Sequence, residues 1–262
     1  MLSLLMPCLN PGRYLGECLD SALPQLSEVD ELVVQDGGST DGSLEVLAAL
    51  AARDRRVRLV SARDSGQSDA LNRALRRARG DLVGFLNADD LLLPGALDAV
   101  RAAVGTRVPE VVVGGWRFVQ ADGTPIREFP ARELRTNPLL LLGCYAFTGG
   151  LYVRRDLLAD GFGTALHYVM DFDLMLRLAE RVTDQVLVHH PVAALRYHRD
   201  SKSGALGRRF WFEGTAVRRA RARGPVQVGV ALAGAALHSV TVATAWLRAS
   251  PGYRELRRLV TR

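Results

Sequence analysis

The first 116 residues alternate between short, uninterrupted apolar runs and longer stretches with helical periodicity. A strand without polar alternation is buried on both faces, as in a parallel sheet whose crossover helices cover it. The pattern therefore predicts an α/β fold: a Rossmann-like, mainly parallel sheet with helices on both faces. The expected strands are residues 2–6, 31–35, 57–61, 82–86 and 111–113, and the expected helices are residues 14–26, 43–53, 68–79 and 94–104.

Four polar loops follow the first four predicted strands. Three of them have a carboxylate just past the strand end, and all are rich in Gly, Asp, Asn and Ser. These residues are ordinary in turns, so any one loop could be only a turn. Because the carboxyl ends of parallel strands meet at one edge of a sheet, four such loops together favour a binding site. The loops are residues 7–13, 36–42, 63–68 and 87–91.

The acidic motif Asn87-Ala88-Asp89-Asp90 directly follows the fourth strand. Carboxylates packed at a strand end repel one another unless a cation is present. Oxygen ligands with open positions suit Mg²⁺ or Mn²⁺ bridging a diphosphate. Asp89 is the stronger candidate for a metal ligand, whereas Asp90 could equally cap the next helix.

A glycine-rich turn at residues 36–43 follows the second strand and leads into a helix. Its glycines allow close backbone approach, and the helix N-terminus favours an anion or an acidic cap. The sequence contains neither GxxxxGK[ST] nor GxGxxG, which argues against P-loop NTPases and dinucleotide-binding proteins. Asp36 could accept a hydrogen bond from a base or ribose, and Asp41 more plausibly caps the helix.

The order and spacing of these motifs over residues 1–203 resemble family 2 glycosyltransferases of the GT-A fold. The resemblance implies an inverting, metal-dependent transfer of a hexosyl group from a nucleotide-diphosphate donor, usually a UDP-sugar, with Mn²⁺ or Mg²⁺. It rests on Pro7 and Asn10, Asp36-Gly-Gly-Ser-Thr-Asp-Gly, Asp64-Ser-Gly-Gln-Ser-Asp-Ala-Leu-Asn, Gly80-Asp81, Phe85-Leu-Asn-Ala-Asp-Asp and Met170-Asp171-Phe-Asp-Leu.

The resemblance also implies roles for individual residues. Asp36 and Asp64 would hold the base and ribose, and Asn87-Ala88-Asp89 would be the DxD-type element. Asp89 and His198 would bind the metal, with His198 near the diphosphate and followed by Ser201-Lys202-Ser203. The implied donor-binding residues are Pro7, Asn10, Asp36, Asp64, Gly66, Asn87 and Ala88.

Asp171 resembles the catalytic base of the family, which would take the proton from the acceptor hydroxyl. The alternative is that Asp171 is a first-turn acid that complements the helix dipole. For His198, a structural or solvated side chain is an alternative of equal weight to a metal ligand. The sequence departs from the family pattern at Asn87, Met170 and Leu9, where Asp, Glu and an aromatic residue are common.

The resemblance divides residues 1–203 into a nucleotide-sugar-binding half, residues 1–116, and an acceptor-binding half, residues 117–203. Pro125, Pro130 and Pro138 predict a loop-rich start to the second half. A helix is expected at residues 169–181, and short strands at residues 147–153, 185–189 and 192–197, the last two flanking Pro191. Residues 147–150 could line the acceptor pocket or form a bulged core strand.

The C-terminal part differs in character. Residues 196–262 contain 14 basic and 3 acidic side chains, a net charge of +11, whereas the first 195 residues have a net charge of −5. This asymmetry favours an anionic partner for the C-terminal part. The sequence lacks the interleaved aromatic and basic residues of a nucleic-acid recognition motif, so we do not expect nucleic acid to be that partner.

Residues 224–247 form a run of 24 residues without Asp, Glu, Lys or Arg. The run is long enough to cross a bilayer. Its Ala- and Gly-rich composition and weak polar stripe favour a helix packed on the protein, on a partner subunit or in the lipid interface. We therefore expect a helical tail, residues 204–262, that binds an anionic membrane surface or mediates a homodimer.

Three cysteines without a CxxC pair fit a reducing compartment. The short apolar N-terminal run lacks a basic n-region, so we expect neither a signal peptide nor a spanning helix there. These features predict a cytoplasmic protein, either free or peripheral at the inner face of the plasma membrane. The family resemblance implies that it acts on a glycan or lipid-linked acceptor.

Two other functions are compatible with an α/β nucleotide-binding fold. A sugar-nucleotide pyrophosphorylase would need a glycine-rich, basic phosphate loop after the first strand, which residues 7–13 do not resemble. A non-catalytic nucleotide-sugar-binding module would not need the four carboxylates Asp36, Asp64, Asp89 and Asp171, all of which are present.

Overall fold

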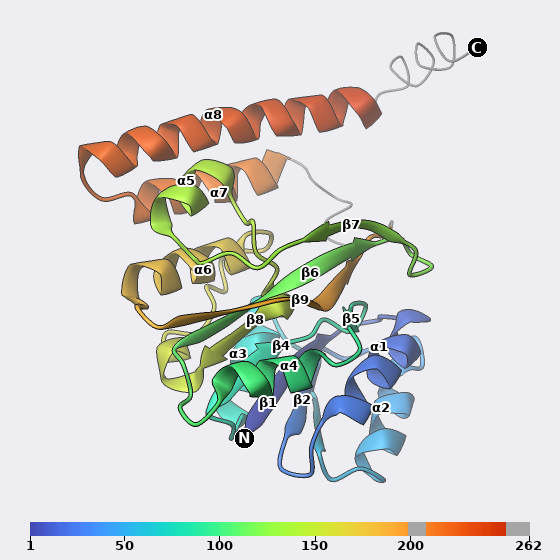
Figure 1. The fold of residues 1–262 in the computed structure, drawn as a ribbon. Coiled ribbons are helices and arrows are strands. Elements are labelled where there is room, and N and C mark those ends of the chain that lie inside the picture. The colour runs from blue at the N-terminus through green and yellow to red at the C-terminus, as the bar shows by residue number, and fades with distance from the viewer. Residues whose placement is uncertain (199–207, 250–262) are drawn as a thin grey trace.

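A computed structural model of the chain describes residues 1–198 and 208–249 (Figure 1). Within these residues the centre is a curled sheet of nine strands, flanked by helices. The strands are β1 (Leu2–Cys8), β2 (Glu31–Asp36), β3 (Val57–Ser61), β4 (Leu82–Phe85), β5 (Leu91–Leu92), β6 (Val111–Val119), β7 (Pro125–Phe129), β8 (Leu151–Arg154) and β9 (Gln185–Arg196). The α-helices are α1 (Tyr14–Ala22), α2 (Ser43–Ala51), α3 (Gln67–Arg77), α4 (Ala96–Val104), α5 (Thr136–Leu142), α6 (Met170–Arg181), α7 (Arg208–Arg221) and α8 (Gly224–Ala249).

The strands lie in the order β3-β2-β1-β4-β8-β6-β9-β5, and β7 extends β6 as a hairpin. Parallel pairing joins β1 to β2 and β4, β2 to β3, and β6 to β9. β8 runs antiparallel between β4 and β6, and β5 runs antiparallel to β9. The four N-terminal strands are parallel as predicted, and one continuous sheet joins them to the second half of the chain.

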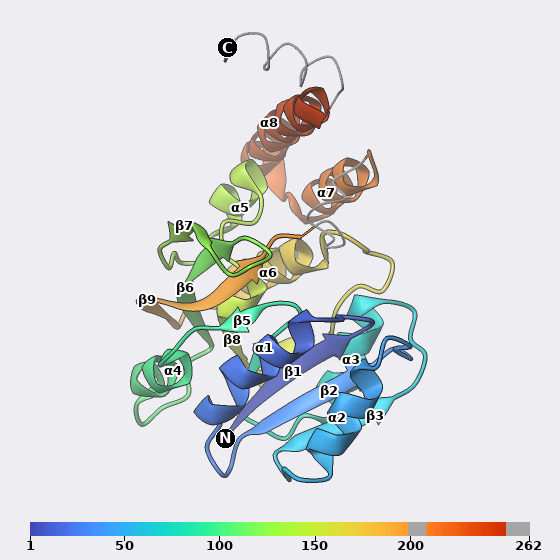
Figure 2. The ribbon, with the colours of Figure 1, turned by 90° about the vertical axis from the view of Figure 1, so that its right-hand side faces the viewer.

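The first strand shows why helices cover both faces of the sheet. Successive side chains of a strand point to opposite faces. Leu5 packs in a core with Leu71 of α3, whereas Leu4 and Met6 pack in a second core with Leu15 of α1. Figure 2 shows helices flanking the sheet. The predicted α/β class is confirmed.

The prediction of two short strands around Pro191 is wrong, because residues 185–196 form the single strand β9. Proline cannot donate to a strand ladder and is tolerated at a bulge. The register between β6 and β9 shifts at Gly114 and Gly115, where Gly115 lies opposite Pro191. This bulge lets β9 continue to Arg196, which brings the end of the strand to the loop after β4.

Residues 117–150 contain more regular structure than the sequence predicted. β6 extends beyond residue 113 to Val119, and β7 and α5 follow it. Pro125 opens β7 and Pro138 lies in the first turn of α5, two positions where the missing N–H is tolerated. The strand expected at residues 147–153 begins only at Leu151, because Thr148–Gly150 form a 3-10 turn.

The helical C-terminal part is confirmed by α7 and α8 (Figure 1). α8 packs against α5: a Cβ on Gly234 would lie 2.0 Å from the carbonyl oxygen of Leu140, so a side chain at this position would force the helices apart. No helix of the described residues is both long and apolar enough to cross a membrane.

Candidate active site

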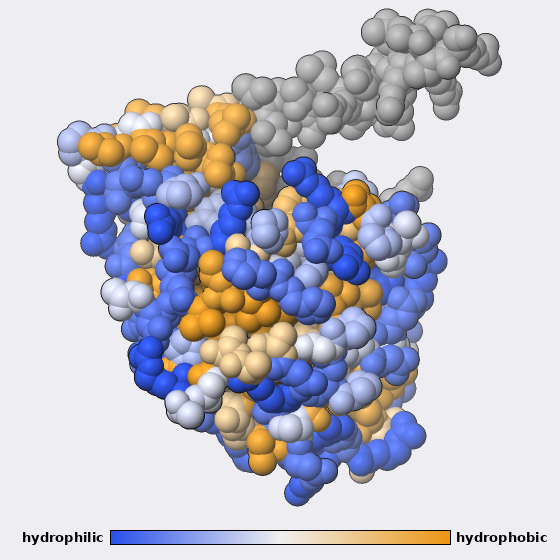
Figure 3. Space-filling view, viewed as in Figure 1, coloured by the Kyte–Doolittle hydropathy of each residue, from blue (hydrophilic) through white to orange (hydrophobic). Residues whose placement is uncertain are grey.

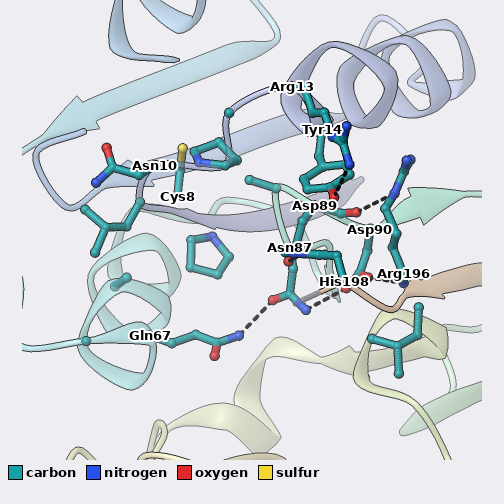
Figure 4. Close-up of a pocket in the computed structure, with 18 of the residues that line it drawn as sticks. Cys8, Asn10, Arg13, Tyr14, Gln67, Asn87, Asp89, Asp90, Arg196 and His198 are labelled. Atoms are coloured by element: carbon teal, nitrogen blue, oxygen red, sulfur yellow. Dashed lines mark hydrogen bonds and ion pairs between the residues drawn. The ribbon is translucent and has the colours of Figure 1, made fainter. Parts of the chain in front are cut away.

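One cavity of about 620 Å³ lies where the loops after β1, β3 and β4 meet the end of β9 (Figure 4). This is the sheet edge at which the polar loops were expected to converge. Eight predicted residues line it: Pro7, Asn10, Asp64, Gly66, Asn87, Ala88, Asp89 and His198. Lining residues that were not singled out from the sequence include Arg13, Tyr14, Gln67, His167 and Arg196. Gln67 could have been found, since it lies inside the motif that begins at Asp64.

Asn10 ties the loop after β1 to the loop after β2. Its backbone has a positive φ of 49°, a conformation that asparagine tolerates better than most residues. Its N–H donates to Ser39 Oγ at 2.9 Å, and its Oδ1 accepts from the N–H of Thr40 at 2.8 Å. The N–H of Gly12 donates to Asp41 Oδ2 at 2.7 Å. These bonds fix the backbone of one side of the cavity.

Asp36 is not among the residues that line the cavity. Its buried carboxylate accepts hydrogen bonds from the hydroxyls of Ser39 and Ser61 and from the N–H groups of Gly38 and Ser39. Burial alone would raise the pKa of Asp36, but these donors hold it below its ordinary value. In the structure Asp36 therefore organises the glycine-rich turn from beneath.

Asp64 lies against that turn and faces the cavity. A Cβ on Gly37 would lie 2.8 Å from Asp64 Oδ2, so a side chain there would displace the carboxylate. Asp64 Oδ1 accepts from the N–H of Gly66 at 3.0 Å. The glycine at position 37 thus permits the loops after β2 and β3 to meet.

Asn87 bridges Gln67 and Asp90 (Figure 4). Its Oδ1 accepts from Gln67 Nε2 and its Nδ2 donates to Asp90 Oδ2, both at 2.8 Å. Burial, with a further contribution from Asp89, raises the pKa of Asp90 well above its usual range. A carboxylate at position 87 could not donate to Asp90 as the Asn87 amide does, and it would add a further acidic group beside Asp89 and Asp90. This accounts for asparagine at the place where the family commonly has aspartate.

Asp89 and His198 form the pair best placed to hold a cation. Asp89 Oδ2 and His198 Nε2 are hydrogen-bonded at 2.9 Å, and the ring of Tyr14 lies 4.4 Å from that of His198. Adjacent ligands of an octahedral ion at about 2.1 Å are about 3 Å apart, so the spacing suits Mg²⁺ or a similar ion. The described residues contain no group of three or more His, Cys, Asp or Glu that could hold a metal. A bound ion would therefore take further ligands from water or substrate.

Arg196 holds this corner of the cavity together, and no sequence motif marked it. Its guanidinium is fully buried and donates to Glu17 Oε2 at 2.6 Å and to the carbonyl oxygens of Asp89 and Ala121, both at 3.0 Å. Its backbone N–H donates to Asp90 Oδ1 at 2.8 Å. One side chain thus joins α1, the turn after β6 and the loop that contains Asp89.

Asp171 lies in the first turn of α6 and, like Asp36, is not among the lining residues. Its Oδ1 accepts from the N–H of Phe172 at 2.8 Å. His167, four residues earlier, does line the cavity. Residues 201–203, expected to follow His198 near the diphosphate, lie outside the described residues.

The sequence profile of glycosyl transferase family 2 matches residues 3–162. The chain belongs to this family. A chondroitin synthase of Pasteurella multocida is 32% identical over 187 residues, which cover 69% of this chain and 19% of that protein. The glycosyltransferase chain thus spans about a fifth of this relative.

Solved structures show the same fold. TarS 1-349 of S. aureus in complex with UDP-GlcNAc aligns with a TM-score of 0.68 at 17% identity, covering 83% of this chain and 65% of TarS. Glucosyl-3-phosphoglycerate synthase from Mycobacterium tuberculosis in complex with Mn²⁺, UDP and glucosyl-3-phosphoglycerate aligns with a TM-score of 0.60 at 23% identity, covering 86% and 81%. The predicted GT-A fold is confirmed.

We expect Arg196→Met to lower the free energy of unfolding by about 2 kcal/mol or more, because it removes a fully buried guanidinium and leaves two part-buried carbonyl oxygens without these donors. Denaturant unfolding measures the change. Arg117→Met is the matched control, since Arg117 lies on β6, the strand that pairs with β9, and contacts Glu128 in an exposed ion pair. Its loss should stay below about 1 kcal/mol. Equal losses in the two variants would contradict the role given to Arg196.

Proposed function

We propose that this family 2 glycosyltransferase moves a hexosyl group, with inversion, from a UDP-sugar to a hydroxyl of a glycan or lipid-linked acceptor. The observation that supports this most strongly is the Asp89–His198 pair at the wall of the strand-end cavity. The UDP-GlcNAc complex of TarS favours a uridine nucleotide as the donor. The chondroitin synthase relative favours a role in cell-surface polysaccharide or glycolipid synthesis.

On this proposal Asp89 and His198 bind Mn²⁺ or Mg²⁺ together with the diphosphate of the donor. The cation, when bound, offsets the charge that develops on the leaving diphosphate. Asp64, Gly66 and the backbone of Pro7 and Asn10 hold the nucleoside across the cavity, while Asn87 and Ala88 line the floor of the diphosphate site. The Mn²⁺ and UDP complex of the mycobacterial synthase supports such a metal.

Inversion requires a base on the face of the anomeric carbon opposite the leaving group. We assign that role to Asp171. Two observations support it: the motif Met170-Asp171-Phe-Asp-Leu, and the place of Asp171 just after the loop that brings His167 to the cavity. Asp173, two residues further along α6, is buried and ion-paired with Arg177 and Arg221, so it is not available for this task.

The pyrophosphorylase alternative is disfavoured by the loop after β1. The N–H groups of Asn10 and Gly12 already donate to Ser39 and Asp41, so they do not form a phosphate cradle. If the protein binds the nucleotide-sugar but transfers no sugar to any acceptor, it is a non-catalytic nucleotide-sugar-binding module.

We expect Asp89→Asn to abolish the Mn²⁺-dependent part of UDP binding, because a neutral amide is a much weaker ligand for a hard cation. Calorimetric titration of UDP with and without Mn²⁺ measures the effect. Asp98→Asn, an exposed position on α4, is the control and should bind like the wild type. Undiminished transfer in excess chelator, or unchanged Mn²⁺ dependence in Asp89→Asn, would refute the metal site.

Asp171→Asn removes the proton acceptor and keeps the shape of the side chain. The expected kcat falls by about two to four decades while UDP binding survives. Asp173→Asn is the contrast: it breaks two ion pairs and should lower the midpoint of thermal unfolding, with a much smaller loss of kcat. Near-normal transfer by Asp171→Asn would contradict the catalytic role and leave Asp171 as a first-turn acid that complements the dipole of α6.

The arginines of the C-terminal part contribute less free charge than the sequence indicated. Arg218 is buried and donates to the carbonyl oxygen of Leu140. Arg221 and Arg223 pair with Asp173 and Glu180.

The outward side of α8 is apolar (Figure 3), with exposed Val226, Val228, Leu232 and Leu237. We propose that this side lies in the interface of an anionic membrane, at the inner face of the plasma membrane, near a lipid-linked acceptor.

Sedimentation with vesicles tests this placement. We expect binding to anionic vesicles, weakened by salt and by Val226→Asp. Val46→Asp, an exposed valine on α2, is the control and should bind like the wild type. If the wild type binds no vesicles and forms a homodimer that Val226→Asp dissociates, the partner of the apolar side of α8 is a second subunit and not a membrane.

A further inference from the structure

The loop at residues 163–169 links the cavity to the proposed base. It brings His167 to the cavity wall and leads directly into α6, whose second residue is Asp171. The position of this loop therefore bears on both the donor site and the base.

The start of the loop is fixed to α3 through Phe162, the residue just before it, and through Leu166. Asn72 bonds both backbone groups of Phe162: its Nδ2 donates to the carbonyl oxygen at 2.9 Å, and its Oδ1 accepts from the N–H at 2.7 Å. Ser68 Oγ donates to the carbonyl oxygen of Leu166 at 3.2 Å. Because α3 begins at the cavity-lining Gln67, this end of the loop is anchored to the donor side.

The second part of the loop is fixed from the C-terminal part of the chain. Glu213 of α7 accepts from the N–H groups of His167 and Tyr168 through Oε2, at 2.9 and 2.8 Å. Its side chain is only 11% exposed, and its Oε1 accepts from Arg209 Nε at 3.1 Å. Hydrogen bonds from two adjacent N–H groups to one carboxylate are charge-assisted. Such bonds are stronger than hydrogen bonds between neutral groups.

We propose that Glu213 is a positioning residue for sugar transfer: it sets the backbone at His167 and Tyr168 and thereby the approach of Asp171 to the acceptor hydroxyl. This rests on the proposed function. It places α7 within the catalytic unit, beyond the boundary at residue 203 that the sequence indicated. α7 has other anchors, since Arg221 pairs with Asp173 of α6 and Arg218 bonds Leu140. Loss of the Glu213 carboxylate should therefore release the loop without undocking the helix.

Steady-state kinetics of Glu213→Ala tests the proposal. The expected kcat falls by between about tenfold and a hundredfold, as for a small displacement of catalytic groups, while Mn²⁺-dependent UDP binding stays near wild type. Glu213→Gln keeps an acceptor oxygen and should restore part of the kcat. Arg209→Ala removes the other partner of Glu213 and leaves both loop bonds, so its kcat should match the wild type.

Stability is controlled with Trp211→Phe, which breaks the bond from Trp211 Nε1 to Ser239 between α7 and α8. If this variant loses as much thermal stability and as much kcat as Glu213→Ala, the role is merely structural and the proposal is overturned. Wild-type kcat in Glu213→Ala would overturn it as well.

Hydrogen exchange separates this proposal from the proposed function, because it needs no turnover. The His167 and Tyr168 amides should exchange faster in Glu213→Ala than in the wild type and Arg209→Ala. Unchanged exchange refutes the restraint on the loop. Failure to detect any sugar transfer by the wild type, with the exchange difference present, refutes the proposed function alone.

Discussion

The candidate site depends on one buried guanidinium. Arg196 stands at the end of β9 and satisfies carbonyl oxygens from two separate loops while pairing with Glu17 of α1. A buried charge is costly unless every donor is used, so its neighbours must hold their positions. Asp90 accepts from the backbone of the same residue, and His198 follows two positions later. The spacing between Asp89 and His198 is therefore set by the end of β9 and not by the acidic loop alone.

The N-terminal half of the fold was predictable because each strand is buried on both faces and each crossover is an amphipathic helix. β2 has all six residues buried and matches its predicted start. The second half was harder for physical reasons. Pro191 interrupts the strand pattern but lies at a bulge, and Pro125 and Pro138 occupy element starts where proline is tolerated. The antiparallel insertion of β8 between β4 and β6 is a long-range pairing that no local pattern reports.

The candidate site was partly predictable for a similar reason. Residues in the loops that follow strand ends, such as Asp64 and Asp89, lie at the cavity because the sheet aligns those ends. Asp36 was expected at the same edge, but it is the last residue of β2, and Ser39 and Ser61 donate to its carboxylate under the turn. Arg196 and Glu213 belong to no motif, since the loop backbone groups that they bond lie far away in sequence. Such contacts follow from the tertiary fold and leave no local signal.

The central claim is that Asp89 and His198 bind the cation that accompanies the donor diphosphate. Its most direct test is the anomalous scattering of manganese in crystals grown with UDP and Mn²⁺. We expect a single strong anomalous peak within about 2.3 Å of both Asp89 Oδ2 and His198 Nε2, with diphosphate oxygens completing the coordination. UDP in the cavity with the peak elsewhere, or with no peak at all, would contradict it.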